Sequence, residues 1–157
     1  MELRDVLDAA VTDAAAEGKT KDEVLRALSV KLLENGYISD LERFIADIYR
    51  READGPTGMG GVISIPHGKS PAAKKMGVAV ARTAAPVRWE SCVSDDGWQE
   101  TRLVFLFCVL DDAEFAENHL SLLAQLAEKL GSKARVERLL TCQSAEALLE
   151  TLLAEGA

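Results

Sequence analysis

Apolar residues recur at helical spacing in three stretches of the first third of the chain. Residues 3–17 carry leucine and valine at this spacing before a glycine, which predicts a first helix. The series Thr20-Lys21-Asp22-Glu23 has the form of a capping box and predicts the start of a second helix. A similar series at 39–42 precedes another apolar stripe and predicts a third helix that runs into Glu52.

The pattern then changes from helical spacing to short apolar runs. A segment rich in glycine and proline, 54–61, separates the predicted helices from four strand-like runs at 62–65, 77–82, 86–89 and 102–110. The last run is apolar without alternation, as expected of a central strand that is covered on both faces. A long helix from Asp111 to Leu130 and two short helices at about 133–140 and 145–153 are predicted to follow. We therefore expect residues 1–157 to form one α/β domain with a mixed sheet.

Composition narrows the possible partners and location. The net charge is −8, and lysine and arginine do not cluster into a face that could follow a phosphate backbone, so no nucleic-acid partner is expected. No apolar run approaches the roughly 18 residues of a membrane span, and the charged N-terminus has no signal-peptide core. A cytoplasmic protein without direct membrane insertion is predicted. The three cysteines have no CxxC spacing, which argues against a disulfide framework or a zinc site.

The two histidines are the candidates for chemistry. Pro66 should end the strand 62–65, because proline cannot donate to a sheet ladder and fixes its own φ. His67 would then be held at a strand end, with Gly68 allowing the backbone to fold back beside the imidazole. Taken alone, His67 could equally be a turn residue. His119 lies on an apolar face of the long helix and, taken alone, is more simply a buried core histidine.

Further groups near His67 in the sequence suggest the kind of ligand. Arg51 ends the third helix, and the loop that follows supplies a hydroxyl and several backbone amides, as anion-binding loops do. An imidazole with these neighbours suits phosphate or another oxyanion. It suits a metal poorly, because no histidine or cysteine spacing supplies enough ligands. The glycines match neither a Walker A loop nor a dinucleotide fingerprint, so we expect no cofactor.

Longer segments resemble a known family. The segment from Arg51-Glu52 through Pro56-Thr57-Gly58-Met59-Gly60-Gly61-Val62-Ile63-Ser64-Ile65-Pro66-His67-Gly68 is similar to the signature of the fructose/mannitol-type (type 2) enzyme IIA domains. These belong to the bacterial phosphoenolpyruvate-dependent sugar phosphotransferase system. The resemblance continues through Pro86-Val87-Arg88-Trp89, Asp96-Gly97 and Asn118-His119-Leu120, and it covers nearly the whole chain.

The resemblance implies a mainly parallel mixed sheet flanked by helices and a role for each candidate residue. His67 matches the histidine that accepts a phosphoryl group from the histidine-containing phosphocarrier protein and passes it to a cognate enzyme IIB. His119 matches a hydrogen-bonding companion, and Arg51 matches the residue that stabilises the phosphoryl group. The expected phosphate loop consists of Thr57, Gly58, Gly60, Gly61 and Gly68.

Two alternatives stay open at this point. Nitrogen-type relatives of the family use the same histidine to report metabolic state by changing which proteins they bind. A metal-dependent hydrolase that uses both histidines is improbable. For the successive protein partners, Met59 and Phe115 are candidates for an apolar docking rim, although both could equally pack inward.

Overall fold

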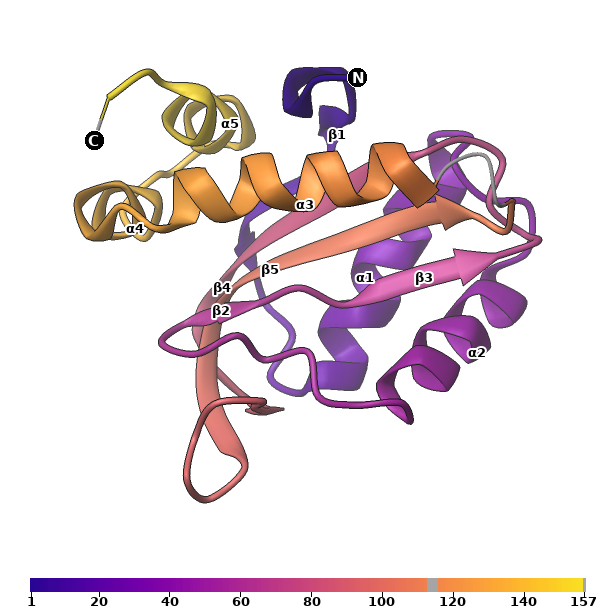
Figure 1. The fold of residues 1–157 in the computed structure, drawn as a ribbon, viewed down its shortest axis with the longest axis horizontal. Coiled ribbons are helices and arrows are strands. Elements are labelled where there is room, and N and C mark those ends of the chain that lie inside the picture. Colours follow the sequence, from indigo (N-terminus) through magenta and orange to yellow (C-terminus); the bar gives the residue numbers. More distant parts are fainter. Residues whose placement is uncertain (113–115, 157) are drawn as a thin grey trace.

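A mixed β-sheet divides the protein into two layers of helices (Figure 1). The structure is a computed structural model that describes residues 1–112 and 116–156. In this part of the chain the sheet has five strands. Four of them follow the order β1-β4-β5-β2, and the fifth, β3, also pairs with β5, at residues further along β5 than those that pair with β2. Only β4 and β5 are antiparallel, so the predicted α/β fold with a mainly parallel sheet is confirmed. The strands are β1 (Leu7–Ala16), β2 (Ile63–Ser64), β3 (His67–Ser70), β4 (Gly77–Glu90) and β5 (Trp98–Leu110).

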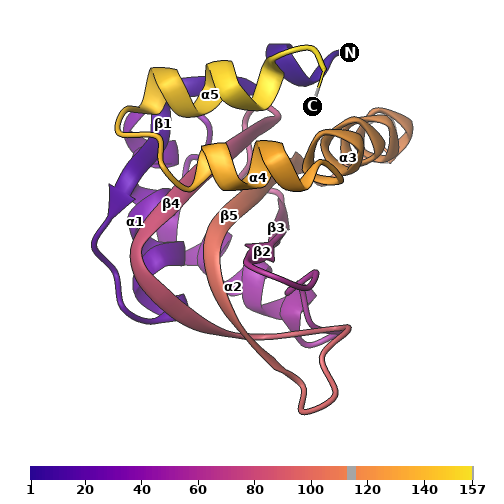
Figure 2. The ribbon, with the colours of Figure 1, turned by 90° about the vertical axis from the view of Figure 1, so that its left-hand side faces the viewer.

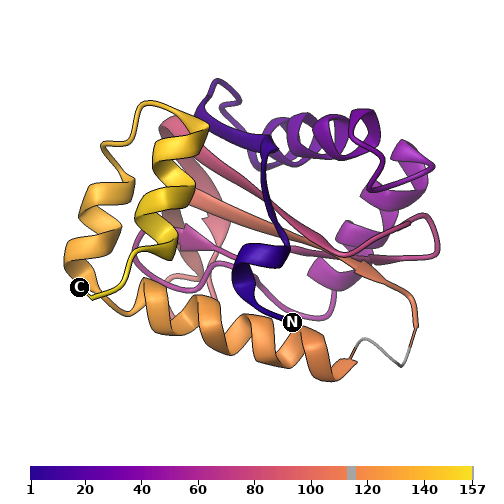
Figure 3. The ribbon, with the colours of Figure 1, turned by 90° about the horizontal axis from the view of Figure 1, so that it is seen from above.

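Helices cover both faces of the sheet. Two of them, α1 (Lys21–Glu34) and α2 (Leu41–Glu52), pack on one face around a core that includes buried residues of β4 and β5. The opposite core lies beneath α3 (Ala116–Leu130), α4 (Lys133–Leu139), α5 (Ala145–Leu153) and the short 3-10 turn η1 (Leu3–Asp5). Figure 3 shows the sheet between the purple α1–α2 layer and the orange α3, and Figure 2 shows α5 crossing β1. Of the described helices, none is long and apolar enough to cross a membrane.

Side-chain caps fix where the helices begin. Thr20 accepts a hydrogen bond from the Glu23 amide, and the Glu23 carboxylate accepts from the Thr20 amide, so the predicted capping box at α1 is formed. At α2 the cap is Asp40, whose carboxylate accepts from the Arg43 amide. The long helix is described from Ala116 onward, and Asp111 lies in a bend before it rather than at its cap.

The prediction of a helix over residues 3–17 is wrong. After the η1 turn this segment forms β1, an edge strand that pairs in parallel with β4. Its alanines favour a helix locally, but parallel pairing with β4 and burial of Val11 at 0% exposure outweigh that preference. Two aspartates of the strand accept hydrogen bonds from amides two residues ahead: Asp8 from Ala10 and Asp13 from Ala15. These side chains occupy amides that an edge strand would otherwise leave unpaired.

The prediction that Pro66 ends the strand needs correction as well. Strand β2 ends at Ser64 and β3 begins at His67, so only Ile65 and Pro66 separate the two strands. The registers Ile63↔Leu103 and His67↔Phe107 have the same offset, so β2 and β3 follow β5 as one interrupted line. Proline is tolerated because its own carbonyl still accepts from the Phe107 amide, and the line lies at the edge of the sheet.

Gly68 is needed for packing rather than for a turn. It lies within β3 and does not have a positive φ. A Cβ atom at this position would lie 2.4 Å from the ring of Phe44, a fully buried side chain of α2. The glycine therefore allows α2 to approach the strand that carries His67.

The two runs predicted at 77–82 and 86–89 belong to one strand, β4. Its pairing with β5 shifts register between Arg82 and Val87, where the exposed residues 84–86 interrupt the apolar pattern. Beyond the shift, β4 and β5 extend past the helical layers as a hairpin, and the predicted turn at Asp95-Asp96-Gly97 closes it (Figure 1). The two short C-terminal helices lie where the sequence predicts them.

Candidate functional site

The two histidines meet above Phe107 on the α3 face of the sheet. The imidazole of His67 stacks on the Phe107 ring with centroids 5.1 Å apart and planes 11° from parallel. His119 comes from α3 and meets the His67 ring edge-on, at a centroid distance of 4.8 Å. Residues 52 positions apart in the sequence therefore form one site, because α3 returns over the strand that carries His67.

The backbone next to Pro66 fixes the tautomer of His67. Its Nδ1 lies 2.9 Å from the carbonyl oxygen of Ile65. A carbonyl only accepts, so Nδ1 carries the proton and Nε2 keeps its lone pair. The carbonyls of Val62 and Pro66 accept hydrogen bonds from amides of β5. The carbonyl of Ile65 instead accepts the hydrogen bond from the His67 imidazole. A nucleophilic nitrogen on a neutral ring is the result.

The surroundings of both imidazoles favour the neutral form. Burial first, and then the neighbouring His119 and Arg51, lower the pKa of His67 to about 4, although the hydrogen bond to Ile65 acts in the opposite direction. The pKa of His119 is also lowered, by burial first and then by the charge of Lys69. Near pH 7 both rings are thus available as neutral donors and acceptors.

His119 has an unused polar atom that points to a ligand. Its Nε2 is buried and has no hydrogen-bond partner among the described residues. A buried ring nitrogen without a partner is costly in an apolar interior. The interpretation of His119 as an ordinary, satisfied core histidine therefore does not fit the structure.

A pocket of about 300 Å³ opens beside the two rings. Arg51 reaches it from the end of α2, where its Nη1 donates to the carbonyl of Gly55 at 3.1 Å. Among the described residues no carboxylate lies within ion-pair distance of the Arg51 guanidinium. Its charge is therefore available to an anion in the pocket. The complete lining is Arg51, Pro56, Thr57, Met59, Ile65, His67, His119 and Leu123.

Thr57 lines the same pocket, but its hydroxyl is already engaged. The Thr57 hydroxyl donates to the Glu52 carboxylate at 2.7 Å and accepts from the indole nitrogen of Trp89 at 3.1 Å. The other oxygen of Glu52 forms an ion pair with Lys21, whose ammonium also reaches Glu90. Because a hydroxyl has a single proton, Thr57 fixes the loop to α2 and β4 in this arrangement.

The glycines of the predicted phosphate loop contribute mainly to this same attachment. The amide of Gly58 donates to the carbonyl of Glu90, and that of Gly60 donates to the side chain of Gln99. A Cβ at Gly58 would lie 2.5 Å from the Glu90 carbonyl, so glycine is required for this close approach. Gly60 and Gly61 have φ values of 99° and 56°, which favour glycine. None of these four glycines, Gly68 included, lines the pocket.

Exposed apolar side chains lie at and near the pocket. Met59, which lines it, is 51% exposed, and Leu120, next to His119 in the chain, is 67% exposed. Met59 therefore does not pack inward. Phe115, the other residue predicted for the rim, lies outside the described residues.

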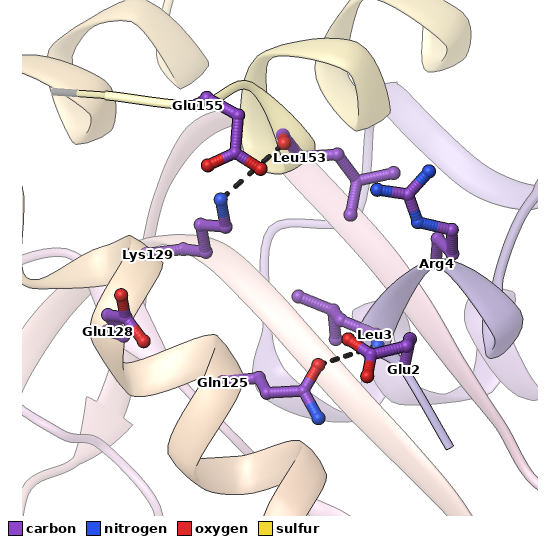
Figure 4. Close-up of a pocket in the computed structure, with 8 residues that line it drawn as sticks. All are labelled: Glu2, Leu3, Arg4, Gln125, Glu128, Lys129, Leu153 and Glu155. Carbon is purple, nitrogen blue, oxygen red and sulfur yellow. Dashed lines mark hydrogen bonds between the residues drawn. The ribbon is translucent and has the colours of Figure 1, made fainter.

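Another pocket, of about 220 Å³, lies near the two ends of the chain (Figure 4). Side chains of α3 project toward both terminal segments: Gln125 accepts from the Leu3 amide at 2.8 Å, and Lys129 donates to the carbonyl of Leu153 at 3.5 Å. These polar groups hold the ends against α3, and neither histidine takes part. The pocket with His67 and His119 is therefore the candidate site.

Comparison with known proteins identifies the family to which the fold belongs. Residues 5–155 match the family model described as "Phosphoenolpyruvate-dependent sugar phosphotransferase system, EIIA 2". The chain belongs to this family. As an EIIA component it is a phosphotransferase that works through a phosphohistidine.

Individual relatives of this EIIA have different names. The chain is 33% identical over 137 residues to the PTS system 2-O-alpha-mannosyl-D-glycerate-specific EIIABC component of Escherichia coli K12, matching 87% of this chain and 20% of that protein. It thus spans about a fifth of the length of that relative. It is 28% identical to the mannitol-specific enzyme IIA component of Halalkalibacterium halodurans, over 94% of each chain. Among solved structures, nitrogen regulatory protein IIA-Ntr of Neisseria meningitidis has a TM-score of 0.81 at 28% identity, with 94% of this chain and 97% of that chain covered.

The sequence predicted the ionisable groups of this site but not the residues that hold them in position. It did not predict that the Ile65 carbonyl binds His67, that Phe107 lies beneath both rings, or that Glu52 binds Thr57. The signal for Glu52 was present, since it directly follows Arg51 in the segment that resembles the family. The signal for Phe107 was absent, because an apolar residue in a central strand can face either side.

Proposed function

We propose that this EIIA carries a phosphoryl group on Nε2 of His67, taking it from the phosphohistidine of the phosphocarrier protein and passing it to an enzyme IIB during sugar uptake. The observation that carries the proposal is the hydrogen bond from His67 Nδ1 to the Ile65 carbonyl. It leaves Nε2 as the nucleophilic nitrogen, in a pocket that also contains Arg51 and His119.

The transfer itself needs no acid or base from the protein. The lone pair of His67 Nε2 forms the new N–P bond while the N–P bond of the donor breaks, and the donor ring, protonated on its other nitrogen, takes that electron pair and leaves as neutral imidazole. His67 retains its Nδ1 proton throughout, so the positive charge passes from the donor ring to the phosphorylated His67 ring. A phosphoryl group in transfer carries most of its charge on its equatorial oxygens, so catalysis depends on positioning and charge stabilisation.

In this proposal Arg51 and His119 supply that stabilisation. The guanidinium of Arg51 offers forked N–H donors with a permanent positive charge. His119, when its proton is on Nε2, offers one neutral donor through an atom that has no partner among the described residues. A neutral donor stabilises the phosphoryl oxygens without the second fixed charge that would slow release to the next carrier.

The partners and the sugar are part of the proposal. The family name implies a phosphoenolpyruvate-driven chain of carriers, and the mannosylglycerate relative is an EIIABC protein, in which an EIIB accompanies the EIIA. We propose an enzyme IIB as the acceptor and a sugar of the fructose/mannitol class as the transported substrate. A single EIIA domain over residues 1–157 and a cytoplasmic location, both expected from the sequence, belong to the same proposal.

The test is phosphorylation in a purified system. Incubation with phosphoenolpyruvate, enzyme I and the phosphocarrier should add one acid-labile phosphoryl group, measured as intact mass, and His67→Ala should abolish the gain. Arg51→Ala and His119→Ala should remain folded by circular dichroism and accept phosphate more slowly. Lack of any gain, under conditions in which the phosphocarrier itself is charged, would refute the proposal.

A second candidate function is regulatory. The similarity to IIA-Ntr of Neisseria meningitidis favours it, because that protein is described as a nitrogen regulatory protein. In this case the phosphorylated protein would bind different proteins without passing its phosphate to an enzyme IIB. Rapid transfer from phosphorylated His67 to a purified enzyme IIB of the fructose or mannitol type supports transport, whereas a stable phosphorylated form with altered binding supports regulation.

A further inference from the structure

Lys69 projects from the same face of the sheet as His67. Successive side chains of a strand alternate between faces, and β3 follows this rule. Gly68 and Ser70 face α2, where Phe44 closes over Gly68 and Asp47 binds the Ser70 hydroxyl at 2.6 Å. His67 and Lys69 therefore face the α3 side, with Cα atoms roughly 6.6 Å apart.

Lys69 lines two cavities, one together with His119 and the other together with Arg51. One, of about 260 Å³, is lined by Lys69 together with His119, Leu120 and Asp112. The other, of about 210 Å³, is lined by Lys69 together with Arg51. A flexible lysine that borders both cavities can extend along the open side of the histidine pair.

Lys69 forms no ion pair with a carboxylate of the described residues. The residue is exposed, and the ion pairs of the described chain do not include it. Carboxylates do border both cavities: Asp112 lines the first, and in the second Asp47 is already paired with Arg43 and Arg50, while Asp54 and Asp111 lie at the exposed edge. The charge of Lys69 acts on His119, because it contributes to the lowered pKa of that side chain.

Phosphorylation places three negatively charged oxygens in a pocket whose described lining contains one cationic side chain, Arg51. The His67 ring, which keeps its Nδ1 proton, becomes positively charged when Nε2 bonds to phosphorus, but it has no N–H directed at these oxygens. A second cationic donor at the open side would bind phosphoryl oxygens that Arg51 does not reach.

We propose that Lys69 is a second cationic group of the phosphorylation site, whose ammonium binds oxygens of the phosphoryl group on His67 together with Arg51. This inference rests on the proposed function and adds to it a residue that directly contacts the transferred group. Because the lysine is exposed and flexible, it engages the phosphoryl group when the group arrives and releases it when the group leaves.

The test compares phosphoryl transfer from the charged phosphocarrier to wild type, Lys69→Gln, Lys69→Glu and Lys69→Arg by rapid-quench kinetics. We expect Lys69→Gln to be roughly 3- to 50-fold slower at low salt, the range expected for one unit charge at this separation. Lys69→Glu should be slower still, and Lys69→Arg should retain most of the rate. The salt dependence of the rate should become shallower in Lys69→Gln, and the pKa of His119, followed by NMR, should rise.

A matched control removes the same charge elsewhere. Lys133→Gln changes an exposed lysine at the start of α4, and it should leave both the rate and the pKa of His119 unchanged. If wild type is phosphorylated on His67 but Lys69→Gln and Lys69→Glu match it at low salt, the inference about Lys69 is wrong and the proposed function stands. If wild type gains no phosphate, both are overturned.

Discussion

Substitution of Gly68 by alanine tests whether close packing behind the strand holds His67 in place. The added Cβ would lie 2.4 Å from two atoms of the Phe44 ring. Carbon atoms in contact are normally about 3.5–4.0 Å apart, so the atom would be more than about 1 Å too close. Phe44 is 0% exposed, and its ring cannot rotate into solvent to relieve the contact. Either α2 or β3 must move.

The expected cost follows from this geometry. Overpacking a well-packed core usually costs about 1–3 kcal/mol, and a rigid, fully buried ring favours the upper end. At roughly 2–4 °C per kcal/mol for a chain of this size, 3 kcal/mol lowers Tm by about 6–12 °C. Since β3 also carries His67, a displacement of the strand by about 1 Å should slow phosphoryl transfer by up to roughly 100-fold.

The assay is thermal unfolding together with the transfer rate measured below the unfolding transition. Gly77→Ala is the matched control, because its Cβ would lie 2.4 Å from the Tyr37 ring, while Gly77 lies at the start of β4 and outside the site. This control should lose stability and keep its transfer rate. Adding Phe44→Leu to Gly68→Ala should recover at least about 1 kcal/mol relative to the sum of the single changes. A Tm of Gly68→Ala within about 2 °C of wild type would refute the reasoning.

Three further predictions concern other contacts. Thr57→Val leaves Oε2 of Glu52 and the indole N–H of Trp89 without their hydrogen-bond partner and should cost roughly 2–5 kcal/mol in urea unfolding, whereas Thr57→Ser keeps both bonds and should cost about 1 kcal/mol. Because the pKa of His67 is lowered to about 4 in the folded state, the unfolded state binds more protons between about pH 6.5 and 4, and stability should fall as pH falls through this window. From pH 7.5 to 5 this loss is about 2 kcal/mol, and a steeper or equal fall in His67→Gln would contradict the assignment. Arg135 is 3% exposed and donates to carbonyls at the ends of α3 and α5, so Arg135→Met should lower stability by roughly 2–4 kcal/mol without changing the transfer rate of the folded protein.

The sequence predicted most of the helices because their signals are local. The Thr20–Glu23 capping box and the apolar stripe of α2 fix the two N-terminal helices within one or two residues. The segment that forms β1 was mistaken for a helix because its leucines and valines fall at helical spacing before a glycine. What makes it a strand is pairing with β4, some 70 residues away in the sequence, and no local pattern carries that information.

The candidate site was predictable in its ionisable groups and not in its geometry. His67, Arg51 and His119 were identified from the sequence, and the structure brings them to one pocket. The role expected of the loop in binding phosphate stays a prediction, and in this structure the amides of Gly58 and Gly60 donate to protein acceptors. Donors in a loop are visible in a sequence, but the acceptors that use them come from β4 and β5 and become known only with the fold.

The shared register of β2 and β3 along β5 has a consequence for how this protein could be altered. The pairing of His67 with Phe107 determines where the His67 imidazole lies on the sheet, and the carbonyl of Ile65 determines which nitrogen of that imidazole carries the proton. Neither depends on the side chains of Pro56 or Met59, which form part of the pocket wall. Partner preference can therefore diverge, in evolution or by design, through changes at these two positions while the reactive nitrogen stays where it is.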